Sequence, residues 1–495
     1  MAAPAVTDHA SPGGETVAGR RVGAADVAAV SVAALATLAL VVPTYARRPF
    51  WFDELVSLEV ASSSWSAFAE YVATIEANMA LYHAALRGWL WIGEGEAGVR
   101  ALSVAFALGT LPIFYALARR LYDRRTAVIA VLLLSVNVSF VGYSRDARSY
   151  ALTLLLVTAA SYALVRAVDG SRRRDWALYG VTAALAVWAH LLASLVVVAH
   201  LVWLALERRA RPVRGFALGA TVLGTLLVPL ALAVLLGAQH PQLEWLPRPG
   251  PQKLPGLVQW FVESRATVVV YFVGAAASLV HALLAWRRER ANRPRRESLL
   301  VLWLVLPPAI AFVASYATPL YLYRYFLACL PALVLLVAAG FARLRPAWLG
   351  LGLAVVALAL SVRTVESCQP DCKIRYDDWR SATAYLESRA RRGDAIVAYP
   401  REVRTPLDHY LAHGRPRLLY PARWGLGGGG VALGAEDLSE AMDAAAAYRR
   451  VWLVTWWLSS EAAREAIAAR ATRLDEMEFA GNVGVELFRI TEAGG

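Results

Sequence analysis

Long apolar stretches recur along this chain up to about residue 364, and they constrain its fold more than any other feature. About eleven of them have the roughly 17 to 25 residues that an α-helix needs to cross a bilayer. They lie at approximately 24–45, 99–118, 126–142, 151–168, 175–190, 191–206, 216–237, 267–286, 298–317, 322–342 and 347–364. With 58% hydrophobic residues, the chain is too apolar for one soluble core. The sequence therefore predicts a polytopic, all-α membrane protein.

Clusters of arginine fall in every second loop between these stretches. They lie at 119–125, 172–174, 208–214, 287–296 and 343–345. Because loops rich in Arg and Lys stay in the cytoplasm, we predict that these loops are cytoplasmic and that residues 1–23 form a disordered cytoplasmic tail. The formal net charge of +12 then reflects topology rather than nucleic-acid binding. Positive charge is almost all Arg, which hints at a GC-rich bacterial genome and so at a bacterial plasma membrane.

The opposite, outer face receives the remaining segments, which are 46–98, 143–150, 238–266 and everything after about 365. We therefore divide the chain into a membrane domain at 24–364, with its long outer loop 46–98, and an extracytoplasmic domain at 365–495. The pattern of residues in this last domain predicts a small α/β fold. Helical periodicity at 379–391 precedes a turn and the apolar run 395–399, and a second such unit follows at 437–448 and 451–455.

Two further patterns in this last domain carry less information. Cys368 and Cys372 lie on the side of the membrane where disulfides persist, so a short disulfide clip and two free thiols are both open. The glycine run 427–430 lacks a following Lys-Ser or Lys-Thr, which indicates a flexible loop rather than a phosphate-binding turn. No nucleotide-binding signature occurs in the sequence.

The candidate chemistry begins where the first apolar stretch ends. Asp53 and Glu54 follow it directly, and ionisable residues at such a place are costly unless they have a function. An amphipathic stretch at 56–72 is predicted to lie in the membrane interface. The run from Asn78 to His83 then leads into another interfacial helix and contains Tyr82.

The second outer loop is short and highly polar. It places Arg145, Asp146, Arg148 and Tyr150 between two apolar stretches. A guanidinium binds oxyanions through two parallel hydrogen bonds and stays charged, so these arginines suit a phosphate. His190 and Arg324 are predicted at two other outer turns.

Together these motifs resemble the integral-membrane glycosyltransferases of the GT-C type, near glycosyltransferase family 39, which includes protein O-mannosyltransferases and aminoarabinose transferases. The resemblance extends over 24–364. It rests on Phe52-Asp53-Glu54, Asn78 to His83, Tyr143 to Tyr150, His190 before an apolar stretch, and Arg324-Tyr325-Phe326. Where the family commonly has Pro-Pro-Leu-Tyr, this chain has Met79-Ala80-Leu81-Tyr82.

The resemblance implies a polyprenyl-phosphate sugar donor, a glycan, lipid or protein acceptor on the outer face, and inversion at the anomeric carbon. We predict that Asp53 is the general base and that Arg148, supported by Arg145 and Arg324, stabilises the departing phosphate. For His190 three roles stay open: a hydrogen bond to the phosphate, a divalent metal site shared with Glu54, or a buried structural histidine.

Two other classes of protein are alternatives. A membrane transporter would also have many spans and buried charges, but it would be expected to show repeated halves or broken helices. A membrane-anchored binding protein would leave the outer loops without clustered charges, which these loops contain.

Overall fold

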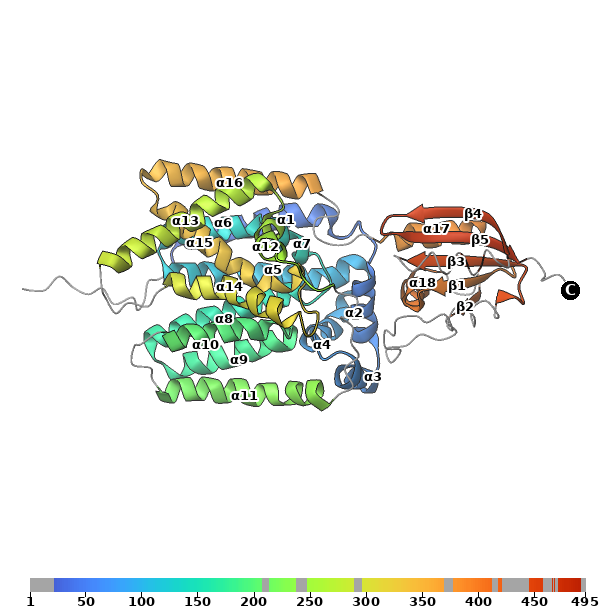
Figure 1. Cartoon of the computed structure of the whole chain (residues 1–495), viewed down its shortest axis with the longest axis horizontal. Coiled ribbons are helices and arrows are strands. Elements are labelled where there is room, and N and C mark those ends of the chain that lie inside the picture. The colour runs from blue at the N-terminus through green and yellow to red at the C-terminus, as the bar shows by residue number, and fades with distance from the viewer. Residues whose placement is uncertain are drawn as a thin grey trace, which may run out of the picture.

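A bundle of long helices and a separate five-stranded sheet make up the computed structural model of the chain (Figure 1). The structure describes residues 22–206, 213–236, 247–288, 296–368, 377–411, 417–420, 445–456, 465, 467 and 471–490. The long helices are α1 (Ala24–Tyr45), α5 (Glu96–Leu121), α6 (Arg124–Ser135), α8 (Tyr150–Gly170), α9 (Arg173–Ala189), α10 (Ala193–Leu206), α11 (Val213–Leu236), α13 (Arg265–Arg288), α14 (Arg296–Ala314), α15 (Leu330–Arg343) and α16 (Ala347–Cys368).

Shorter helices connect these at several points. They are α2 (Phe52–Ser62), α3 (Trp65–Glu70), the π-helical η1 (Tyr71–Ile75), α4 (Ala80–Trp89), the 3-10 helix η2 (Leu90–Ile92), α7 (Val138–Ser144), α12 (Lys253–Val262) and the 3-10 helix η3 (Tyr323–Cys329). Helices α2, α3 and α4 lie at the end of the bundle that faces the sheet (Figure 1). We call this the sheet-facing end.

The helices confirm a multi-pass membrane protein. Among the described residues, eight helices are long and apolar enough to cross a membrane, or nine if α6 and α7, bent by 57°, form one span. Each predicted apolar stretch falls on a helix or a pair of helices. Helices α9 and α10, which have 17 and 14 residues, are not among them. The predicted number of about eleven spans is therefore not confirmed.

Helix α15 forms the centre of the bundle. Within Tyr323–Arg343, 94% of an 18-residue stretch is buried, and α15 contacts α6, α13, α14 and α16. Gly274 of α13 and Gly340 of α15 meet backbone to backbone, because a Cβ atom at Gly340 would collide with the carbonyl group of Gly274. Small residues at such a crossing let two membrane helices approach closely.

The C-terminal part, which we call the sheet domain, has the predicted α/β architecture. Its elements are α17 (Trp379–Arg389), β1 (Ala395–Tyr399), η4 (Arg401–Val403), α18 (Arg404–Tyr410), β2 (Arg417–Tyr420), β3 (Arg450–Trp456), β4 (Ala471–Phe479) and β5 (Val483–Ile490). The strand order is β2-β1-β3-β5-β4. β1 is parallel to β2 and β3, whereas β5 is antiparallel to β3 and β4.

Burial explains the apolar run of β1. One face of the sheet packs on α17 and α18 through residues such as Trp379 and Leu407, and the other face has its own cluster around Val397 and Leu453. A strand covered on both faces is expected to be apolar throughout. Most of the second predicted helix, 437–444, lies outside the described residues, as do Cys372 and the glycine run 427–430. Cys368 is disulfide-bonded.

Candidate active site

The two adjacent carboxylates at the start of α2 have different environments. Glu54 is fully buried and forms an ion pair with Arg100 of α5, whose side chain is also fully buried. Arg100 Nε donates to Glu54 Oε1 at 2.7 Å, and Arg100 Nη2 donates to Oε2 at 2.5 Å. The backbone N–H groups of Ala147 and Trp51 donate to the same carboxylate at 2.9 and 3.3 Å. Glu54 is therefore hydrogen-bonded on both oxygens.

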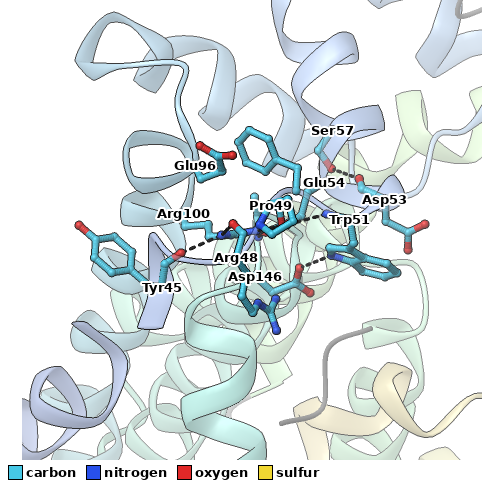
Figure 2. Close-up of polar contacts among 12 residues, drawn as sticks. Tyr45, Arg48, Pro49, Trp51, Asp53, Glu54, Ser57, Glu96, Arg100 and Asp146 are labelled. Carbon is cyan, nitrogen blue, oxygen red and sulfur yellow. Dashed lines mark hydrogen bonds and ion pairs between the residues drawn. The ribbon is translucent and has the colours of Figure 1, made fainter. Parts of the chain in front are cut away.

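Arg100 also holds the chain that leads into α2. Its guanidinium donates to the carbonyl oxygens of Tyr45, Arg48 and Pro49 at 2.7, 2.8 and 2.9 Å, as Figure 2 shows. Sequence reasoning missed Arg100. The sequence could have indicated this residue, because an arginine inside a predicted membrane span is costly and needs a partner.

Asp53 points away from this network (Figure 2). Its side chain is 22% exposed, and two guanidiniums flank it without forming close hydrogen bonds. Arg324 Nη2 lies 3.6 Å and Arg148 Nη2 lies 3.9 Å from Asp53 Oδ2. The structure thus brings together a carboxylate and two cations from three distant parts of the chain and leaves the carboxylate accessible.

Arg148 is fixed by the backbone and side chains of α2. Its Nη1 donates to the carbonyl oxygen of Asp53 and to the hydroxyl of Ser57, both at 3.2 Å. Burial alone would lower the pKa of Arg148, but the carboxylates of Asp53 and Glu76 outweigh this and raise it. The guanidinium stays charged although it is buried, and its Nε has no hydrogen-bond partner among the described residues.

The other two charged residues of this loop contact the chain that enters α2. Arg145 donates to the hydroxyl of Thr44 at the end of α1. Asp146 Oδ1 accepts from the indole N–H of Trp51 at 3.0 Å. Burial, followed by repulsion from Glu54, raises the pKa of Asp146. Both residues are buried, and both contact the segment that leads into α2.

Aromatic rings and a histidine form another side of the site. The His190 ring lies 5.1 Å from that of Tyr325 and 6.0 Å from that of Tyr150, centroid to centroid. The backbone N–H of Leu192 donates to His190 Nδ1 at 3.3 Å, so Nε2 is the protonated nitrogen. Within the described residues, that Nε2 and the hydroxyl of Tyr150 are buried without a partner. Buried donors without partners are rare and indicate a ligand or water.

The loop between η1 and α4 adds a carboxylate that sequence reasoning did not single out. Glu76 accepts from the hydroxyl of Tyr71 at 3.0 Å. Asn78 Nδ2 lies 3.5 Å from Glu76, and Asn78 Oδ1 accepts from the N–H of Leu191 at 2.9 Å. Burial raises the pKa of Glu76, whereas Arg148 lowers it. Asn78 therefore links Glu76 to the turn that carries His190.

Tyr82 and His83 lie in the packed interior of α4. The Tyr82 hydroxyl lies 3.4 Å from that of Ser103. Burial, assisted by the charge of Arg148, lowers the pKa of His83 to about 3, so this ring is neutral near pH 7. Met79, the residue before α4, has φ of 67°, a value that a proline ring forbids. The departure from Pro-Pro-Leu-Tyr at Met79 therefore fits the backbone.

A cavity of about 440 Å³ lies beside the site. Its lining residues are Glu59, Ser62, Ser63, Ala67, Glu70, Tyr71 and Ile75. Tyr71 forms part of this lining and also donates to Glu76, so it connects the cavity with the site.

The described residues contain no group of three or more His, Cys, Asp or Glu side chains that could hold a metal ion. Glu54, which we considered as a metal ligand with His190, has both oxygens bonded to Arg100. Its environment therefore favours a structural ion pair over metal binding.

A family profile described as dolichyl-phosphate-mannose-protein mannosyltransferase matches residues 78–235, less than half of the chain. No curated protein matches at a significant level. Among solved structures, apo ArnT from Cupriavidus metallidurans is similar with a TM-score of 0.58 at 13% identity, covering 93% of this chain and 97% of ArnT. The chain has the GT-C fold.

The match covers a smaller share of two other GT-C proteins than of ArnT. Arabinofuranosyltransferase AftD from Mycobacteria has a TM-score of 0.57 at 14% identity, over 94% of this chain and 40% of AftD. The oligosaccharyltransferase of Archaeoglobus fulgidus has a TM-score of 0.52 at 13% identity, over 86% of this chain and 68% of that enzyme. At these identities the likeness establishes the GT-C fold, which the sequence motifs predicted.

Proposed function

We propose that this protein transfers a sugar from a polyprenyl-phosphate donor to an acceptor hydroxyl at the outer face of a bacterial plasma membrane. The N-terminus is then cytoplasmic and the sheet domain extracytoplasmic. The observation that carries the proposal is Asp53, an accessible carboxylate with Arg324 and Arg148 at 3.6 and 3.9 Å. The GT-C fold supports it, since ArnT of the same fold was solved with undecaprenyl phosphate bound. The acceptor is a glycan, a lipid or a protein.

The arrangement suits a single displacement. Asp53 accepts the proton of the acceptor hydroxyl while the acceptor oxygen forms a bond to the anomeric carbon. The bond from that carbon to the phosphate oxygen breaks, and the phosphate leaves with the electron pair. Because attack and departure occur on opposite sides, the anomeric configuration inverts. One base suffices, in contrast to the carboxylate pair of glycosidases.

The cations around Asp53 act on the phosphate. Arg148 and Arg324 lie beside the same carboxylate oxygen. The Nε of each has no hydrogen-bond partner among the described residues, so each guanidinium has a donor left for an oxyanion. Fixed charges aimed at a developing negative charge usually supply much of a catalytic effect. His190, with its Nε2 proton unpaired, and the hydroxyl of Tyr150 are further donors for the donor phosphate.

The remaining predicted residues have supporting roles in this proposal. Glu54 positions α2 through Arg100 and does not meet the substrate. Arg145 and Asp146 hold the segment before α2. Asn78 orients the His190 turn, and Tyr82 and His83 pack beneath it in α4.

The test is turnover by membranes given radiolabelled polyprenyl-phosphate sugars of several types. Asp53→Asn keeps the side-chain size and removes the base, so turnover should drop by about 100-fold or more, while binding of polyprenyl phosphate remains. Asp169→Asn, which changes a partly exposed carboxylate near the end of α8 that pairs with Arg120, is the matched control. Near-normal turnover in Asp53→Asn would remove the base from the mechanism.

A further inference from the structure

The sheet domain contacts the segment that carries Asp53. The backbone N–H of Phe50 donates to the hydroxyl oxygen of Tyr410 at 2.7 Å. Tyr410 is the last residue of α18, whereas Phe50 is fully buried three residues before Asp53. A backbone donor of the membrane part is therefore satisfied by a side chain of the sheet domain.

The same hydroxyl also connects to α5. Tyr410 donates its proton to Glu96 Oε1 at 3.0 Å, and Arg380 of α17 forms an ion pair with that same oxygen. Glu96 is the first residue of α5, one turn before Arg100. Burial, followed by the charge of Glu96, raises the pKa of Tyr410, so the phenol keeps its proton near pH 7.

Aromatic contacts continue this interface on both sides of Trp51. The Phe50 ring lies 5.5 Å from that of His409, and the Phe52 ring lies 5.1 Å from that of Trp456 in β3. Such ring pairs contribute stabilisation beyond their buried area. Phe50 and Phe52, the neighbours of Trp51 in the chain, thus both contact aromatic rings of the sheet domain.

The entry to α2 is held from two directions. Arg100 binds the carbonyl oxygens of Arg48 and Pro49 from within the bundle, and Tyr410 binds the next N–H, that of Phe50, from the sheet domain. A catalytic group displaced by about 1 Å can lose roughly 100-fold in rate. The position of Asp53 therefore depends on both contacts.

We propose that Tyr410 is a positioning residue for the transfer reaction and that the sheet domain holds the catalytic segment in place through it. The inference rests on the proposed function of Asp53 as the base. Tyr410 itself does not touch the substrate in this proposal. The sheet domain is then part of the catalytic apparatus rather than an appended module.

The test uses Tyr410→Phe in the full-length protein, which keeps the ring and removes only the hydroxyl. Both hydrogen bonds of this hydroxyl are lost, but only the one to the Phe50 amide holds the segment before Asp53. We therefore expect kcat to fall by about 10-fold, the effect of losing that one bond, with KM for the donor unchanged. Hydrogen–deuterium exchange at the Phe50 amide should also become faster. Tyr385→Phe is the matched control, because its hydroxyl bonds Asp475 within the sheet domain and should change neither measurement.

The outcomes separate this inference from the proposed function. Full kcat and unchanged Phe50 exchange in Tyr410→Phe overturn the positioning role, even when the wild type is an active transferase. A rise in KM alone also overturns it. A wild type inactive on every donor overturns the proposed function, while the exchange measurement still decides whether Tyr410 holds Phe50. If Tyr410→Phe does not fold, Arg380→Gln removes the separate ion pair that ties α17 to the same Glu96 oxygen. Lower kcat in Arg380→Gln then supports a role of the sheet domain in holding the catalytic segment, and full kcat overturns it.

Discussion

The buried pair of Arg100 and Glu54 offers the sharpest test of how the site is built. Replacing Arg100 with Met keeps a long side chain but removes its charge. It also removes five hydrogen bonds, two to Glu54 and three to backbone carbonyl groups. Glu54 then remains buried as a charge with only the N–H groups of Trp51 and Ala147 as donors.

The expected cost follows from this geometry. Removing one partner of a buried ion pair destabilises a protein by about 3–5 kcal/mol, because the other charge is left uncompensated. Glu54→Gln should cost less, about 1–3 kcal/mol, since Arg100 keeps its three carbonyl acceptors. In the double variant, the loss should be smaller than the sum of the two single losses, because the uncompensated charge is absent.

The assay is the free energy of unfolding in mixed detergent micelles, measured for the two single variants and the double variant. Arg120→Met is the matched control, because Arg120 is in the same helix and pairs with a partly exposed Asp169 at 3.0 Å. That pair should contribute less than about 1 kcal/mol. If Arg100→Met costs no more than Arg120→Met, the buried ion pair does not hold this end of the bundle and the reasoning fails.

Two further predictions concern phosphate binding by Arg148 and the protonation of His83. Arg148→Lys keeps the charge but loses the planar fork, so its turnover should be intermediate. Arg148→Ala loses both, so its turnover should be nearly absent and its binding of polyprenyl phosphate weaker. Unchanged binding by a folded Arg148→Ala variant would make Arg148 a structural residue. For His83, whose pKa falls from an ordinary 6.5 to about 3, the unfolded chain binds more protons between these values. Its contribution to stability is thus present above pH 6.5 and lost by about 1.4 kcal/mol per pH unit below it; His83→Gln should flatten this slope in unfolding measurements, and an equal slope in both proteins would contradict the buried neutral ring.

Much of the fold was predictable from local sequence. A stretch of apolar residues that is long enough to cross a bilayer forms a helix whatever its neighbours are, because backbone groups in lipid must bond within the segment. The apolar run of β1 and the periodicity of α17 indicated an α/β domain, because the pattern of buried residues along a segment reflects its local structure. The candidate residues Asp53, Arg148, His190 and their neighbours were recognisable because polar side chains at membrane spans are costly.

The different environments of Asp53 and Glu54 depended on tertiary structure. Neighbouring residues on a helix point about 100° apart, so only one of the two carboxylates could face Arg324, and the sequence does not say which. Arg100 decides this, because α5 presents a guanidinium to Glu54 and leaves Asp53 accessible. Tyr410 likewise meets Phe50 only when the sheet domain is docked. Composition and spacing act along the chain and determine which segments are helices or strands. The partner of a buried charge or donor is instead set by the packing of segments that lie tens to hundreds of residues apart, such as Glu54 with Arg100 and Phe50 with Tyr410.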